Sequence, residues 1–187
     1  MTTMLRMGML APPCTMNLAP MAMNLLRKGE SMAAEVGNKA PDFALVNQDR
    51  EPVKLSEQIG SGNIVLAFFP GAFSGTCTKE MCTLRDSMTQ LNGLGAKVYG
   101  ISTDTFFALK AWADQQKPGF PLLSDYNKEA IKAYDVVNPD MIGLKNIAKR
   151  AVIVIDKGGV IRYREALDDA RNEPDYGKLK DALRTLK

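Results

Sequence analysis

The fold is decided by residues 63–82, which read NIVLAFFPGAFSGTCTKEMC. The opening NIVLAFF is a short apolar run, which is typical of a β-strand buried on both faces. A helix is predicted over about residues 76–94, because apolar side chains recur there with helical spacing: Cys77, Met81, Leu84, Met88 and Leu91. A glycine-containing loop joins the two. Cys77 is therefore expected in the first turn of a helix that follows a buried strand.

The segments on either side continue the alternation of strands and helices. An opening hairpin is predicted at 44–46 and 53–55, further strands at 97–102, 120–123, 151–155 and 160–163, and helices at 105–116, 128–134 and 176–186. The strand–helix–strand order after residue 63 requires a right-handed parallel crossover, whereas the last two strands add an antiparallel edge. We therefore expect an α/β protein with a thioredoxin-like fold, in which helices cover both faces of a central mixed sheet.

Residues 1–31 differ in composition from the rest of the chain. They are rich in methionine, contain three prolines, and have no acidic residue before Glu30. Three interpretations stay open: a disordered N-terminal extension, a targeting segment, or a start assigned too early, with Met32 as the first residue. Residues 32–187 contain no repeats or low-complexity linkers, so we expect them to form one domain.

The charge of the chain argues against two classes of partner. The net charge is +3 over 187 residues, and two of these charges come from residues 1–31, which hold three basic residues and one acidic residue. The remaining +1 leaves no basic stripe of the kind that binds nucleic acid or an anionic membrane. No apolar run in the sequence is long enough to span a bilayer. We therefore expect neither nucleic acid nor membrane as a partner.

The sequence contains no histidine. This excludes nucleophiles that depend on an imidazole base, and it removes the commonest metal ligand, so neither a metal nor another cofactor is expected. The three cysteines are Cys14, Cys77 and Cys82. A small, odd number of cysteines is unlike a secreted disulfide scaffold and favours a cytoplasmic protein with reactive or structural thiols.

Cys77 is the first candidate for chemistry. In the first turn of a helix, unpaired backbone N–H groups and the helix dipole stabilise an anion, and a thiolate is such an anion. Cys77 also opens the apolar stripe, so its side chain is expected in a sheltered pocket. A small buried side chain without a function would occupy the same place. Cys82 lies on the polar side of the same helix.

Glu80 lies one turn after Cys77 and would disfavour its thiolate, so a nearby cation is required. Arg150 directly precedes the predicted strand at 151–155 and could reach the same end of the sheet. There it would pair with Glu80 and donate to the thiolate. Spacing alone favours the alternative, a solvated Arg150 beside Lys149.

Several separated residues resemble the active-site motifs of one family, the peroxiredoxins. The stretch Pro70-x-x-x-Ser74-x-x-Cys77 is similar to the signature of this family, in which a threonine or serine precedes the cysteine by three positions. Glu80 also matches, and Arg150 matches the distant arginine of the family's active site. The resemblance implies a thioredoxin-like fold and a cysteine-based peroxidase.

The Q-type branch, the bacterioferritin comigratory proteins, is the most similar, because Cys82 follows Cys77 by five positions. The resemblance extends from about residue 36 to the C-terminus. It implies reduction of hydrogen peroxide and organic hydroperoxides in antioxidant defence. Cys77 would become a sulfenic acid, and Cys82 would resolve it as an intramolecular disulfide. A thioredoxin- or glutaredoxin-like reductant would then restore both thiols.

The same resemblance implies roles for the neighbouring residues. Ser74 and Arg150 would hydrogen-bond the peroxide and stabilise the departing oxygen. Pro70 would shield the pocket from water, and Glu80 would orient Arg150. A monomer and a homodimer both stay open. Two other functions also stay open: a one-cysteine peroxidase resolved by an external thiol, and a redox sensor that uses peroxide only as a signal.

Overall fold

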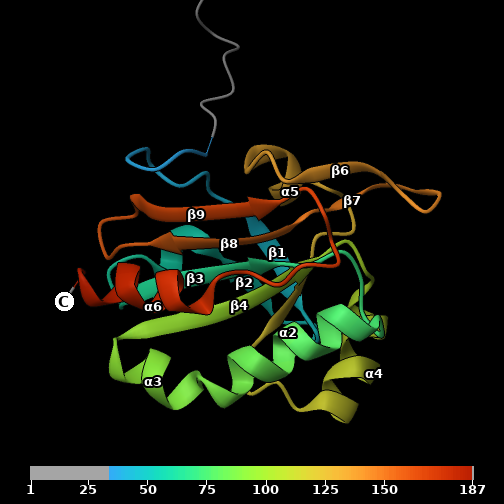
Figure 1. Cartoon of the computed structure of the whole chain (residues 1–187), viewed down its shortest axis with the longest axis horizontal. Coiled ribbons are helices and arrows are strands. Elements are labelled where there is room, and N and C mark those ends of the chain that lie inside the picture. Colours follow the sequence, from blue (N-terminus) through green and yellow to red (C-terminus); the bar gives the residue numbers. More distant parts are fainter. Residues whose placement is uncertain (1–33, 187) are drawn as a thin grey trace, which may run out of the picture. The chain divides into compact units, whose positions relative to one another are not determined.

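The structure, a computed structural model, describes residues 34–186, so the predictions for residues 1–31 and for Cys14 lie outside the described residues. Figure 1 shows the arrangement of the elements. The strands are β1 (Ala44–Asn47), β2 (Pro52–Lys54), β3 (Asn63–Phe68), β4 (Ala96–Ser102), β5 (Leu122–Ser124), β6 (Val137–Met141), β7 (Leu144–Ala148), β8 (Arg150–Ile155) and β9 (Ile161–Leu167). The helices are α1 (Leu55–Gln58), α2 (Gly75–Asp86), α3 (Met88–Gly93), α4 (Phe106–Gln116), α5 (Ala130–Ala133) and α6 (Tyr176–Arg184). None of these helices is both long enough and apolar enough to cross a membrane.

A seven-stranded sheet forms the centre of the fold, in the order β2-β1-β5-β4-β3-β8-β9. The strands β3, β4 and β5 are parallel neighbours, and α2 and α3 form the crossover from β3 to β4. The β8–β9 hairpin is antiparallel to β3 at one edge, and the β1–β2 hairpin is antiparallel to β5 at the other. The predicted mixed sheet and both of its predicted hairpins are confirmed.

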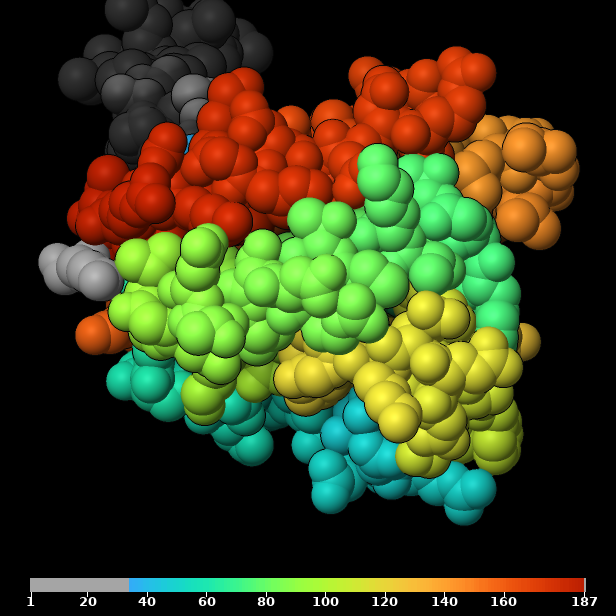
Figure 2. All heavy atoms as spheres, turned by 60° about the horizontal axis from the view of Figure 1, so that its bottom comes forward, coloured from blue at the N-terminus to red at the C-terminus, as the bar shows by residue number. Residues whose placement is uncertain are grey.

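Strand β3 is buried on both faces because its side chains alternate between two core clusters. Leu66 belongs to a cluster with Tyr134 and residues of α5. Ala67 belongs to the opposite cluster, with Met81 of α2, Trp112 of α4 and residues of α6. Figure 2 shows this second face from outside, with α6 in red, α2 and α3 in green and α4 in yellow. Helices therefore cover both faces of the sheet, as expected.

The helix predicted over residues 76–94 is divided into α2 and α3 at Ser87. The N–H of Ser87 is shared between the carbonyls of Thr83 and Leu84, each at 3.1 Å. Such a three-centre bond is typical of a tightening last helical turn. The apolar stripe continues across this break, which is why the sequence pattern alone predicts one helix.

The connection after α5 contains a hairpin that the sequence analysis does not predict. Strands β6 and β7 pair antiparallel around a turn formed by Ile142 and Gly143. Both turn residues have positive φ, 54° and 86°. Such turns favour Asn-Gly, whereas the chain has isoleucine at the first position and Pro139 within β6. The usual sequence signals of a hairpin are therefore missing.

Candidate active site

The loop between β3 and α2 places Cys77 at the carboxyl ends of the parallel strands. Pro70 follows the strand and is buried, Ser74 is the N-cap residue of α2, and Cys77 lies in the first helical turn. The Ala72 N–H donates to Oδ2 of Asp104 at 2.7 Å, which ties the loop to the segment after β4. No sequence motif points to Asp104. The one signal in the sequence is the position of Asp104 just beyond β4. Because β4 is parallel to β3, the carboxyl ends of both strands lie at the same end of the sheet.

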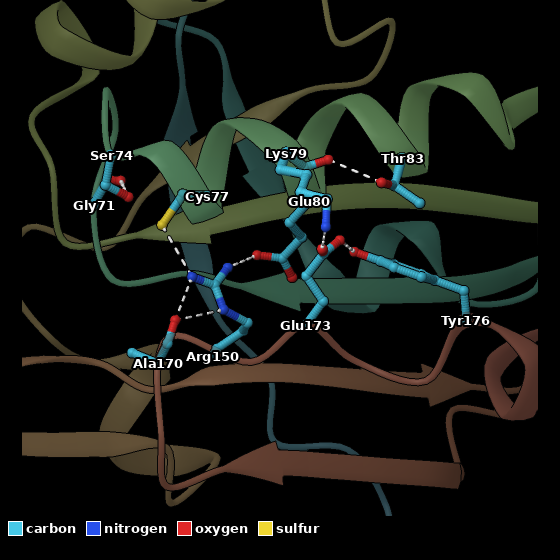
Figure 3. Close-up of polar contacts among 10 residues, drawn as sticks. All are labelled: Gly71, Ser74, Cys77, Lys79, Glu80, Thr83, Arg150, Ala170, Glu173 and Tyr176. Atoms are coloured by element: carbon cyan, nitrogen blue, oxygen red, sulfur yellow. Dashed lines mark hydrogen bonds and ion pairs between the residues drawn. The ribbon is translucent and has the colours of Figure 1, made fainter.

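A guanidinium group meets the thiol inside the protein. Nη2 of Arg150 donates to Sγ of Cys77 at 3.4 Å, and both residues are only 1% exposed (Figure 3). Nη1 of Arg150 forms an ion pair with Oε2 of the buried Glu80. Arg150 is therefore not the solvated residue that spacing alone favours. The cause is strand register, because β8 pairs with β3 so that Ala151 lies opposite Phe68, next to the loop.

Burial makes the charged form of the Glu80 carboxylate unfavourable at this position. Burial raises the pKa of Glu80 to about 8, although Arg150 acts in the opposite direction. Its Oε1 is buried and has no hydrogen-bond partner within residues 34–186. Burial disfavours the charge of Arg150, yet Glu80 and Cys77 beside it raise the pKa of Arg150 above its ordinary value. Arg150 therefore stays a cation beside the thiol.

The segment between β9 and α6 holds the guanidinium from the other side. The carbonyl of Ala170 accepts from Nη2 of Arg150 at 2.9 Å and from Nε at 3.2 Å. Further along, Glu173 forms an ion pair with Lys79 of α2 and accepts from the Tyr176 hydroxyl at 3.1 Å (Figure 3). The sequence analysis missed this segment, since a backbone carbonyl leaves no signal in residue identity.

A cavity of about 770 Å³ opens beside the thiol. Four of the predicted site residues line it: Pro70, Ser74, Cys77 and Arg150. The Ser74 hydroxyl is exposed and donates to the carbonyl of Gly71 at 3.2 Å. Glu80 does not line the cavity and contacts Arg150 from behind. The structure therefore gathers four of the six predicted site residues around one opening.

Cys82 lies apart from this cavity, half-buried and next to Arg85 on α2. Cys77 and Cys82, the two cysteines in the described part of the chain, are both free. Both belong to α2, and a regular helix separates Cα atoms five residues apart by about 8.6 Å. A disulfide requires a separation below about 7 Å. The structure thus represents the dithiol form.

The other features of the described residues offer no competing chemistry. No group of three acidic or cysteine side chains between residues 34 and 186 is placed to hold a metal ion. A second cavity of about 380 Å³ is lined by Phe106, Phe107 and Tyr126 among others, but no cysteine borders it.

Three comparisons relate the chain to known proteins. A sequence model of the AhpC/TSA family matches residues 36–164. The chain is 32% identical over 166 residues to the chloroplastic 2-cysteine peroxiredoxin of Chattonella marina var. antiqua, a match that covers 83% of this chain and 80% of that protein. It is 37% identical over 132 residues to alkyl hydroperoxide reductase E of Mycobacterium tuberculosis, which covers 70% and 84%. The crystal structure of peroxidoxin BcpB from Mycobacterium tuberculosis has a TM-score of 0.71 and 29% identity, over 82% of this chain and 98% of that one.

Proposed function

Because this chain belongs to the AhpC/TSA family of peroxiredoxins and is a thiol peroxidase, we propose that Cys77 is the cysteine that attacks the peroxide. The observation that carries the proposal is the 3.4 Å contact between Arg150 Nη2 and Cys77 Sγ at the wall of an open cavity. A fixed cation and a helix N-terminus both favour the thiolate. Cys82 lies further along α2, away from the helix N-terminus and the cavity, and the cation beside it, Arg85, is paired with Asp86.

In the proposed reaction, the Cys77 thiolate attacks one peroxide oxygen. An S–O bond forms and the O–O bond breaks, so the sulfur is oxidised to a sulfenic acid. The other oxygen leaves with the bonding electron pair and takes up a proton, which gives water or an alcohol. Arg150 stabilises the charge on the departing oxygen, and the Ser74 hydroxyl turns from the Gly71 carbonyl to the substrate. Buried Pro70 excludes water from the thiol.

We assign the second half of the cycle to Cys82. Its thiol condenses with the sulfenic acid, which releases water and leaves a Cys77–Cys82 disulfide. A thioredoxin- or glutaredoxin-like dithiol then exchanges with this disulfide and restores both cysteines. This step requires α2 to open, because the two thiols diverge on a regular helix. That divergence also favours a second candidate, a one-cysteine cycle in which an external thiol reduces the sulfenic acid directly.

The remaining proposals concern the context of the enzyme. We place catalysis in residues 32–187, with residues 1–31 as an extension or targeting segment. A cycle that returns through free thiols suits the cytoplasm, where disulfides are kept reduced. The proposal is compatible with a monomer and with a homodimer, since every residue of the proposed site comes from one chain.

The test is peroxide consumption in the presence of excess dithiol reductant. Wild type should consume many equivalents of peroxide per chain, whereas a sensor would consume one. Cys77→Ser should lose this turnover, because an alcohol at neutral pH does not replace a thiolate. Cys82→Ser is the matched control and should retain the first reaction with peroxide. Full turnover by Cys77→Ser would place the active thiol elsewhere.

A further inference from the structure

The cavity beside Cys77 is much larger than the smallest substrate needs. Its volume of about 770 Å³ falls within the range of sites that enclose organic molecules with tens of atoms. Hydrogen peroxide has only two heavy atoms, and Cys77, Ser74 and Arg150 are sufficient to hold it. The β6–β7 hairpin contributes Met141 and Ile142 to the lining of the same cavity.

The tip of this hairpin holds an isoleucine in a strained and exposed position. Ile142 has a φ of 54° and is 98% exposed. A β-branched residue in this left-handed region is costly, and Asn-Gly would form the same turn without strain. Figure 2 shows the hairpin, in orange, beside the red-orange segment that precedes α6. Strain of this kind is typical of functional positions, and here it holds an apolar side chain at the mouth of the cavity.

The tip is also held in place rather than left loose. The carboxylate of Asp140 accepts from the Gly143 N–H at 2.9 Å and pairs with Lys145, so it bridges the turn from one strand to the other. A fixed tip presents a defined apolar surface, which lowers the entropy lost when a substrate contacts it.

The charges at the mouth favour a neutral substrate. Three carboxylates line the cavity, those of Asp140, Asp168 and Asp169, against the guanidinium groups of Arg150 and Arg171. Asp140 pairs with Lys145, Asp168 with Lys149 and Asp169 with Arg171, and Arg150 pairs with Glu80. Within residues 34–186, the lining therefore has no unpaired charge to attract an ionic substrate.

From these observations we propose that the tip of the β6–β7 hairpin is a specificity element, in which Ile142 and Met141 contact the apolar tail of a neutral organic hydroperoxide. The inference rests on the proposed function, since the hydroperoxide group must lie at Cys77 while the tail extends toward the hairpin. Cys77, Met141 and Ile142 all line the same cavity. Ile142 then favours substrates with an aryl or alkyl tail and has no part in the reaction with hydrogen peroxide.

The test compares kcat/KM for cumene hydroperoxide and for hydrogen peroxide in wild type, Ile142→Asn and Leu144→Thr. Asn-Gly is the preferred pair for this turn, so Ile142→Asn should fold at least as well as wild type. Leu144 is a matched control, because it is 56% exposed on the same hairpin but does not line the cavity. Thermal melts of all three proteins confirm that the hairpin variants are folded.

We expect Ile142→Asn to lower kcat/KM for cumene hydroperoxide about five- to tenfold, the loss expected when part of one apolar contact is removed. The value for hydrogen peroxide should stay within about twofold, as should both values for Leu144→Thr. An unchanged ratio of the two substrates in Ile142→Asn would overturn the role of the hairpin and leave the proposed function standing. Absence of turnover with both peroxides in wild type would overturn the proposed function, and this inference with it.

Discussion

Oxidation of Cys77 and Cys82 to a disulfide should unwind the first turns of α2. In the dithiol form both residues lie on this helix, which begins at Gly75 and continues to Asp86. Their Cα atoms are about 8.6 Å apart, and their side chains diverge by about 140° around the axis. The bond therefore forms only after the segment around Cys77 leaves its helical conformation, which also carries the sulfur away from Arg150.

The cost of this opening follows from the backbone hydrogen bonds that it breaks. About four of them are lost, beginning with the bond from the Thr78 N–H to the Ser74 carbonyl at 2.9 Å. At about 1 kcal/mol each, the opening amounts to about 4 kcal/mol. The amides of residues 78–81 should therefore exchange about a thousandfold faster in the disulfide form than in the dithiol form.

Hydrogen exchange with peptide mass analysis measures this difference on both redox forms. Peptides over residues 74–84 should lose protection on oxidation, while peptides over α4 serve as an internal control and should not change. Cys82→Ser treated with one equivalent of peroxide should stop at the sulfenic acid and keep its helical protection. Further equivalents of peroxide should overoxidise it more readily than wild type. An oxidised wild type with full protection of this helix would refute the reasoning. A bridge from Cys77 to Cys14, or between two chains, would do the same.

Three other predictions concern the surroundings of the thiol. Arg150→Met should slow the first reaction with peroxide by about a hundredfold, because it removes the hydrogen-bond donor at 3.4 Å from Sγ of Cys77. Arg150→Lys should restore little of the rate. Stopped-flow traces of Arg150→Met at the wild-type rate would contradict the assigned role. Burial raises the pKa of Glu80 to about 8 from an ordinary 4.5, so the carboxyl group binds its proton more tightly in the folded state than in the unfolded state. The resulting contribution to stability is complete below pH 4.5 and is lost as the pH rises toward 8. Glu80→Gln should therefore gain stability relative to wild type between pH 5 and pH 8 in urea denaturation, and a constant difference would argue against this titration. Removing residues 1–31 should leave activity unchanged, because no apolar periodicity in them predicts a place in the core. A fall in the thermal midpoint of more than about 5 °C would instead show that they stabilise the domain.

The parts of the fold that the sequence predicts are those with strong periodicity. The run NIVLAFF predicts β3, and the stripe beginning at Cys77 predicts α2 and α3 but not the break between them at Ser87. The β6–β7 hairpin was missed since its turn begins with Ile142, which local propensity disfavours. The contacts of Asp140 with Gly143 and Lys145 stabilise that turn, and residue propensities do not reveal them.

The site was predictable to the extent that side-chain identity carries its chemistry. Cys77 and Glu80 share one helix, so their proximity follows from spacing. Arg150 comes from a distant strand, and its place depends on the pairing of Ala151 with Phe68, which spacing alone does not give. The resemblance to the peroxiredoxin family identifies this residue, and strand register explains its position. The loop anchor Asp104 had no such support and became visible only from its contact with Ala72.

The carbonyl of Ala170 makes the site sensitive to the length of a loop and tolerant of substitution at position 170. Any residue at position 170 offers the same backbone acceptor to Arg150, so substitutions there can drift freely as long as the conformation persists. A deletion of one residue between β9 and α6 would move that acceptor by about 3.5 Å, beyond hydrogen-bond reach. Homologues with the same chemistry should therefore vary in sequence at position 170 while keeping the number of residues in this segment. In library design position 170 is one to randomise, and the segment around it is never to be shortened.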